Sequence, residues 1–122
     1  MITGTVTPDR EAVLRLAIRD AGGQEHEQTV IIDTGYNGWL TLPPNLVASL
    51  GLRWQRFGRA LLADGSEIVF NIYEAIILWD GQPLTISVDE VDAAPLLGMA
   101  LMYGYELIVQ NVDGGTVTLR RM

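Results

Sequence analysis

The residues best suited to chemistry lie where an apolar run ends. Residues 30–35 read Val-Ile-Ile-Asp-Thr-Gly, so a run typical of a buried strand leads directly into Asp33-Thr34-Gly35. Burying an unpaired carboxylate costs several kcal/mol, so we expect Asp33 to reach solvent, to accept hydrogen bonds, or to share a proton with a second acid. Only the last arrangement is reactive. The other two make the triplet an ordinary turn at a strand end, since Asp and Gly are common turn residues.

Two neighbouring carboxylates would supply an acid and a base at one site. Like charges a few ångströms apart cannot both stay ionised, so the pair holds one shared proton and titrates as a unit. Such a pair can take a proton from water while it gives one to a carbonyl oxygen. The chain contains a single Asp-Thr-Gly. A pair built from this triplet therefore requires two copies of the chain related by a two-fold axis.

A second segment strengthens this interpretation. Much later the chain reads Pro95-Leu96-Leu97-Gly98 and continues into an apolar stretch. With the two motifs in this order, the sequence resembles retropepsin-type aspartic proteases, the family of the retroviral proteases. It is most similar to small bacterial retropepsin-like proteins, in which an aromatic residue follows the triplet and a Leu-Pro pair opens a helix, as in Tyr36 to Pro43 here. The resemblance spans the chain from about Val30 to Val109.

The resemblance implies an all-β, retropepsin-like closed β-barrel that forms a two-fold homodimer. The activity it implies is that of an aspartic endopeptidase, which hydrolyses extended segments of a peptide or protein substrate with a water activated by two symmetry-related copies of Asp33. Thr34 would hydrogen-bond across the axis, and Gly35 would allow close backbone approach. No cofactor and no metal ion is expected.

The resemblance also assigns roles to residues outside the triplet. A flap hairpin would close over the substrate, and Leu96, Leu97 and Gly98 would hold the Asp33 turn from beneath. Tyr36 stands where the viral enzymes have a small residue, so it would either wall a substrate pocket or obstruct it. If it obstructs the pocket, the alternative is a non-catalytic dimeric module that binds peptide or protein. The residues at the expected flap tip are Ala63, Asp64, Gly65 and Ser66.

Composition limits the other classes of function. The 122 residues are enough for one domain, 1–122, with a core, and 48% of them are hydrophobic. The net charge of −7 argues against nucleic acid as a partner, although Arg53 to Arg59 interleaves cations with aromatic residues in the manner of single-strand binders. The sequence has no lysine for Schiff-base chemistry and no cysteine for a thiol nucleophile. It shows neither a leader-like segment nor a membrane span, so a cytoplasmic location is expected.

Turn signals divide the chain into short strands. A strand over 13–19 should turn at 20–23 and return as a hairpin, and further hairpins should centre on Asp64-Gly65, Asp80-Gly81 and Asp113-Gly114. One helix is expected from Pro43 to Gly51, because prolines favour its start and Gly its end. The only other helix candidate runs from Pro95 to Tyr103. The pattern thus predicts a β-barrel with one or two short helices.

Three further groups of residues are predicted to be structural. The single histidine, His26, is expected to be a solvated strand residue, because no serine elbow accompanies it. Trp39 and Trp79 lie in apolar contexts, which indicates core or interface positions. The acids Asp89, Glu90 and Asp92 lack the spacing of a calcium loop and are expected in an exposed loop.

Overall fold

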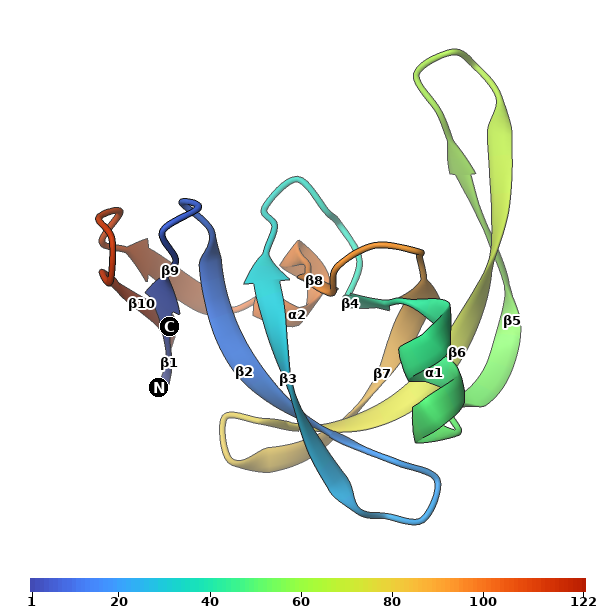
Figure 1. Ribbon diagram of the computed structural model, residues 1–122, viewed down its shortest axis with the longest axis horizontal. Helices are drawn as coiled ribbons and strands as arrows, with labels where there is room; N and C mark the ends of the chain where they lie inside the picture. Colours follow the sequence, from blue (N-terminus) through green and yellow to red (C-terminus); the bar gives the residue numbers. More distant parts are fainter.

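Ten strands and two short helices make up the computed structural model, which describes all of residues 1–122 (Figure 1). The strands and helices are β1 (Ile2–Val6), β2 (Ala12–Arg19), β3 (Glu25–Ile32), β4 (Leu40–Leu42), α1 (Pro44–Leu50), β5 (Arg53–Leu61), β6 (Glu67–Trp79), β7 (Gln82–Glu90), β8 (Leu96–Leu97), α2 (Met99–Met102), β9 (Tyr105–Val109) and β10 (Thr116–Arg121).

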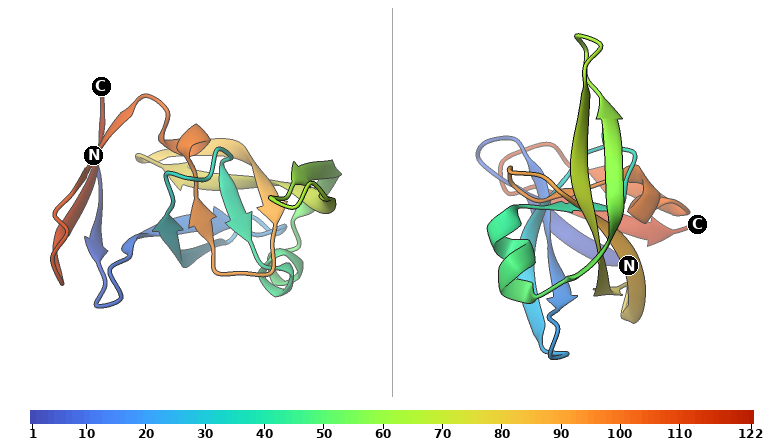
Figure 2. Two further views of the ribbon diagram at one scale, coloured as in Figure 1. Left: turned by 90° about the horizontal axis from the view of Figure 1, so that it is seen from above. Right: turned by 90° about the vertical axis from the view of Figure 1, so that its right-hand side faces the viewer.

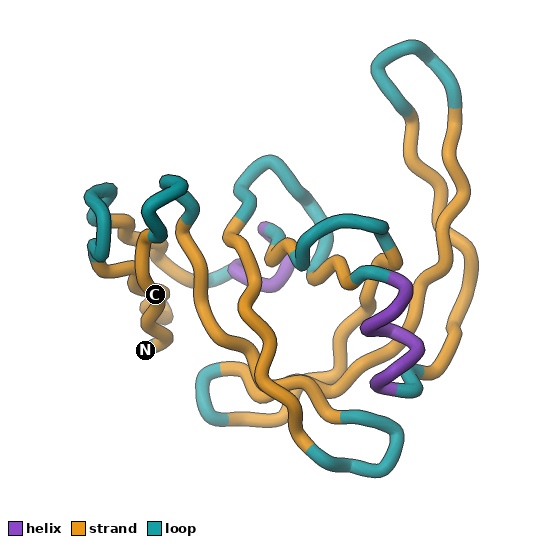
Figure 3. The backbone as a smooth tube through the Cα atoms, viewed as in Figure 1, coloured by secondary structure: helices purple, strands orange, loops and turns teal.

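All ten strands belong to one curved sheet. Its order is β5-β6-β7-β4-β8-β3-β2-β1-β10-β9, and β6 also meets β2 where Ile18 pairs with Ile77. The curvature is visible in the backbone trace, where the strands wrap around a common interior (Figure 3). Strands β5 and β9 are the two edges of the sheet. The β5–β6 hairpin projects from the body, whereas β1, β9 and β10 lie at the other end of the molecule (Figure 2).

Alternating side chains explain why these segments fold as strands around one core. In β2, Leu14, Leu16 and Ile18 are buried, while Arg15 faces outward and pairs with Glu27 of β3 at 2.9 Å. Trp79 is also part of the core, as predicted, with 6% of its surface exposed. Trp39 is 38% exposed and lies outside this core.

Helix α1 forms where the sequence predicts it. Pro43 precedes the helix in an extended conformation, and Gly51 ends it with φ 65°, a left-handed conformation that glycine adopts without strain. Val47 and Leu50 are its buried residues. No helix of the structure is long and apolar enough to span a membrane.

The four predicted hairpins are confirmed. The tightest is the β6–β7 turn, in which Trp79 pairs with Gln82 and the two residues between them, Asp80 and Gly81, have φ values of 52° and 81°. Two successive positive φ values are typical of the type I′ turn, whose twist matches that of the flanking strands.

Two sequence-based predictions are wrong. The helix expected over Pro95 to Tyr103 begins only at Met99, because Leu96–Leu97 form strand β8 between β3 and β4. The exposed loop expected for the acidic cluster starts after Glu90, since Asp89 and Glu90 are paired with β4 at the end of β7. Asp92 alone of the three is in the exposed loop.

Candidate active site

Asp33 lies at the carboxyl end of β3, where the chain turns away from the sheet. Its backbone N–H donates to the carbonyl of Leu97 at 2.9 Å, and its own carbonyl accepts from the N–H of Tyr36 at 3.1 Å. The Gly35 N–H donates to Asp33 Oδ1 at 2.9 Å, which closes an Asx turn. The Asp33 side chain is half-buried, while Thr34 and Gly35 are exposed. The backbone of Asp33 is thus fixed by two hydrogen bonds, and its carboxylate by one backbone donor.

Strand β8, which contains Leu96 and Leu97, lies beside this turn and bonds to it through the Leu97 carbonyl. It runs parallel to β3, with Ile32 opposite Leu97, and antiparallel to β4, with Leu40 opposite Leu97. Leu97 is fully buried. Leu96 is only partly buried, and its N–H donates to the hydroxyl of Thr41 at 2.9 Å. Strand β8 therefore lies between β3 and β4, which are consecutive in the sequence but do not pair with each other.

Gly98 and Met99, which follow β8, hydrogen-bond to the loop that follows Asp33. The N–H of Gly98 donates to the Trp39 carbonyl at 3.1 Å, and that of Met99 donates to the Tyr36 carbonyl at 2.8 Å. A Cβ on Gly98 would overlap the carbonyl oxygen of Gly38 and the ring of Tyr36. Glycine is required here because two segments of backbone approach each other closely.

Within one chain, the Asp33 carboxylate accepts a hydrogen bond only from the Gly35 N–H. No hydrogen bond or ion pair joins its carboxylate to another side chain. No group of three or more His, Cys, Asp or Glu side chains is arranged to hold a metal ion. A single copy therefore presents one carboxylate at this turn.

Tyr36 is directed toward the end of β7. Its hydroxyl donates to Asp89 Oδ2 at 2.6 Å, a contact across 53 positions of sequence. Burial of the phenol raises the pKa of Tyr36 far above its ordinary value, and the hydrogen bond to Asp89 and the negative charge of that carboxylate raise it further. The phenol is therefore a neutral donor at physiological pH.

Tyr36 lines a cavity of about 460 Å³ between the loop that follows Asp33 and the outer half of the β5–β6 hairpin. This volume lies within the range of ligand sites in proteins. The cavity is lined by Tyr36, Thr41, Ala60, Ile68, Val69, Phe70, Asp89, Glu90, Val91, Asp92 and Leu96.

The predicted flap tip is exposed and does not line this cavity. Ser66 donates to Asp64 Oδ1 through its hydroxyl at 2.6 Å and through its N–H at 2.9 Å, and these hydrogen bonds lower the pKa of Asp64. Gly65 supplies the positive φ of the turn, 86°. Ala63 precedes Asp64 in the same exposed loop. The strand residues next to this tip, Ala60 and Ile68, line the cavity instead.

The sequence did not predict a site role for these hairpin residues. Ala60 pairs with Ile68, and Gly58 pairs with Phe70, so the four share one face of the hairpin. Ala60, Ile68 and Phe70 line the cavity. Polar and apolar residues do not alternate along β5 here, because Arg59 shares the opposite face with Phe57 and Leu61, so the sequence offered no periodic signal.

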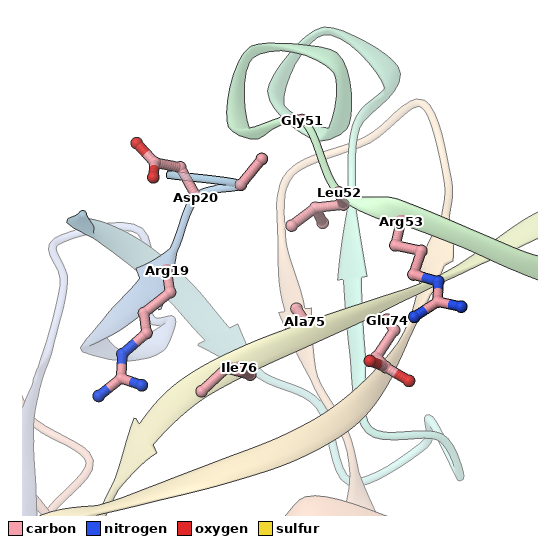
Figure 4. Close-up of a pocket in the computed structure, with 9 residues that line it drawn as sticks. Arg19, Asp20, Gly51, Leu52, Arg53, Glu74, Ala75 and Ile76 are labelled. Carbon is pink, nitrogen blue, oxygen red and sulfur yellow. The ribbon is translucent and has the colours of Figure 1, made fainter. Parts of the chain in front are cut away.

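Two other hollows contain none of the residues around Asp33. One, of about 250 Å³, lies between the end of α1, the β2–β3 turn and β6, with Arg19, Arg53 and Glu74 at its rim (Figure 4). The other, of about 330 Å³, is lined by β1, β2 and Thr29. His26 is partly exposed in β3, as predicted, and its Nε2 lies 2.8 Å from Asp20 Oδ2.

Comparison with known proteins points to one fold. No protein-family model matches the chain, and no curated protein matches its sequence. The structure is similar to the crystal structure of a retropepsin-like aspartic protease from Rickettsia conorii, with a TM-score of 0.62 and 14% sequence identity. The match covers 99% of this chain and 90% of the other. The chain has the fold of the retropepsin-like aspartic proteases.

Proposed function

We propose that two copies of the chain form an aspartic endopeptidase that hydrolyses extended peptide segments. The observation that carries this proposal is the position of Asp33: a half-buried carboxylate, set by a strand end, an Asx turn and a buried strand beneath, with no acidic partner in its own chain. The retropepsin-like fold supports the same assignment. A two-fold axis beside this turn would bring two such carboxylates together.

The shared pair would act as acid and base in turn. One Asp33 would be protonated and the other ionised, because two carboxylates in contact cannot both hold a charge. The ionised member would take a proton from water, and the protonated member would give one to the carbonyl oxygen of the substrate. Thr34 would hydrogen-bond across the axis and so stabilise the two turns. The exposed backbone at Gly35 would approach the substrate.

The edge strand β9 supports the proposed homodimer. Its outer side has no neighbouring strand, and its side chains Ile108 and Val109 are 47% and 39% exposed. Exposed apolar edges are usually covered in proteins, since they otherwise pair with other chains. Strand β9 follows α2, which holds the loop beside Asp33. A second copy packed on this end of the molecule would lie near the proposed axis.

The β5–β6 hairpin would serve as the flap. Its position above the cavity would let an extended peptide lie between its outer half and the body, and closure would exclude water from the reacting bond. Tyr36 would form the wall of this substrate cleft, because its hydroxyl is already bonded to Asp89.

The test compares wild type with Asp33→Asn on an unfolded protein substrate, from acid to neutral pH. We expect the variant to lose cleavage by about 10²-fold or more, since it removes the proton-transfer group. Asp9→Asn, in an exposed turn outside the site, is the matched control and should cleave like wild type. Sedimentation of each protein at the assay concentration should show a dimer.

Three outcomes would count against the proposal. Cleavage that persists in Asp33→Asn would remove the carboxylate from the reaction. A wild type that cuts only as a monomer would remove the dimer. A dimer that cuts nothing, but binds peptide, would indicate the non-catalytic module.

A further inference from the structure

The cavity beside Tyr36 has an uneven chemical character. Its apolar side chains come from both the β5–β6 hairpin and the body, among them Ile68, Phe70 and Leu96. Its charged side chains are all acidic: Asp89, Glu90 and Asp92. No arginine and no histidine is among the lining residues.

The acidic side chains have no cationic partner. None of them takes part in any ion pair of the chain. Asp89 accepts from the neutral Tyr36 hydroxyl, and Glu90 accepts from the Asn71 amide at 3.0 Å. These hydrogen bonds orient two of the carboxylates without neutralising their charge. The apolar groove therefore carries an uncompensated negative potential at the rim made by the end of β7 and the loop that follows it.

We propose that this groove binds an arginine side chain of the peptide substrate, an inference that rests on the proposed peptidase function. An arginine side chain has an aliphatic stem and a planar guanidinium group at its end. The stem would pack on Ile68, Phe70 and Leu96, and the guanidinium would lie between the carboxylates of Glu90 and Asp92. Charge-assisted hydrogen bonds of this kind are stronger than neutral ones.

The geometry assigns separate roles to the three acids. Asp89 is committed to Tyr36 and holds the phenol in the cavity wall. Glu90 accepts from the Asn71 amide through one carboxylate oxygen and lies close to the Tyr73 hydroxyl, and neither neutral group cancels its charge. Asp92 lies in the exposed loop. Glu90 and Asp92 are therefore the residues that determine specificity, and Asp89 is a positioning residue.

A binding assay tests this without relying on catalysis. The protein is the Asp33→Asn variant, and the probes are two fluorescein-labelled decapeptides that differ only in a central arginine or citrulline. Citrulline has nearly the same shape and no charge. We expect the arginine peptide to bind about tenfold more tightly at low salt, and the difference to shrink at high salt.

Two variants in the same background identify the groove. Glu90→Gln combined with Asp92→Asn should remove the difference between the two peptides while binding of the citrulline peptide persists. Asp9→Asn combined with Glu11→Gln changes the net charge equally on exposed residues outside the cavity, and should keep the difference. Equal affinity for the two peptides in the Asp33→Asn protein, or binding of neither, would overturn the proposal. So would a difference that survives in Glu90→Gln/Asp92→Asn.

Cleavage-site analysis separates this proposal from the peptidase function. Digestion of an unfolded protein by wild type should give sites enriched in arginine at one fixed position relative to the cut bond. Cleavage without such enrichment would leave the peptidase function in place and refute the arginine site. If the Asp33→Asn protein prefers the arginine peptide but wild type cleaves nothing, the arginine site would stand and the peptidase function would be refuted.

Discussion

The two sides of the proposed cleft are built in opposite ways. On the body side, which we call the floor (β4, β8 and the Asp33 turn), Leu40, Leu42 and Leu97 are fully buried. On the flap, the part of the β5–β6 hairpin beyond Gly58, Leu61 and Val69 are 74% and 62% exposed. This contrast agrees with the proposed function, in which the Asp33 carboxylate needs a fixed position and the flap must move to admit a peptide.

Glycine substitution should show this contrast most strongly. Gly98→Ala places a Cβ against the backbone carbonyl of Gly38, which cannot move without breaking the loop. Gly58→Ala places one 2.6 Å from the far end of the Phe70 ring, which can rotate away. We expect Gly98→Ala to lower the free energy of unfolding by about 3 kcal/mol or more, and Gly58→Ala by less than about half as much.

Urea unfolding followed by circular dichroism measures both glycine effects. Comparable losses in the two variants would mean that the floor and the flap are equally rigid. A Gly98→Ala protein that does not fold agrees with the expected order, provided that Gly58→Ala folds.

Truncation of leucine should give the next largest effect. Leu97→Ala leaves a cavity under the Asp33 turn, and we expect a loss of about 2–5 kcal/mol in the free energy of unfolding. Leu61→Ala in the flap removes an exposed side chain, so its effect should stay within about 0.5 kcal/mol. Thermal unfolding of the two proteins, monitored side by side, checks this. A larger loss for Leu61→Ala would contradict the division into floor and flap.

The smallest expected effect is a loss of folding stability at alkaline pH, and it depends on Tyr36 at the junction between the floor and the flap. The native state raises the pKa of Tyr36, so above pH about 10 the unfolded chain ionises this phenol while the folded chain keeps its proton. Stability should therefore fall as the pH rises above 10. Tyr36→Phe has no phenol to ionise, so its stability should fall less steeply over the same range.

Tyr103→Phe is the matched control for the alkaline series, because this side chain is 89% exposed. Its melting temperature between pH 9 and 11 should follow that of wild type. An identical alkaline slope in wild type and Tyr36→Phe would show that burial and Asp89 do not protect the Tyr36 proton.

Local signals in the sequence account for the parts of the fold that were predicted correctly. Pro43 and Gly51 bound α1, and Asp80-Gly81 makes a tight hairpin, because each acts through its own backbone conformation. Strand β8 escaped prediction because two residues, Leu96–Leu97, have no period of their own and become a strand only by pairing with β3 and β4.

The candidate site was predicted to a similar extent. The Asp33 turn and the segment beneath it followed from two short motifs. The cavity did not, because its wall depends on the contact between Tyr36 and Asp89, which are far apart in the sequence. Acidic residues are poor strand formers, so the assignment of Asp89 and Glu90 to an exposed loop followed propensity, and pairing with β4 and β6 overrode it. Catalysis and the homodimer stay predictions.

Mixing active and inactive chains tests the central claim most directly. Wild type and Asp33→Asn are refolded together at a fixed total concentration, and the rate of peptide cleavage is measured against the wild-type fraction. If each site needs one Asp33 from each of two chains, the rate follows the square of that fraction, and an equal mixture retains about a quarter of the activity. A rate that falls in direct proportion, to about half in the equal mixture, would show that one chain carries out the reaction alone and would contradict the shared pair.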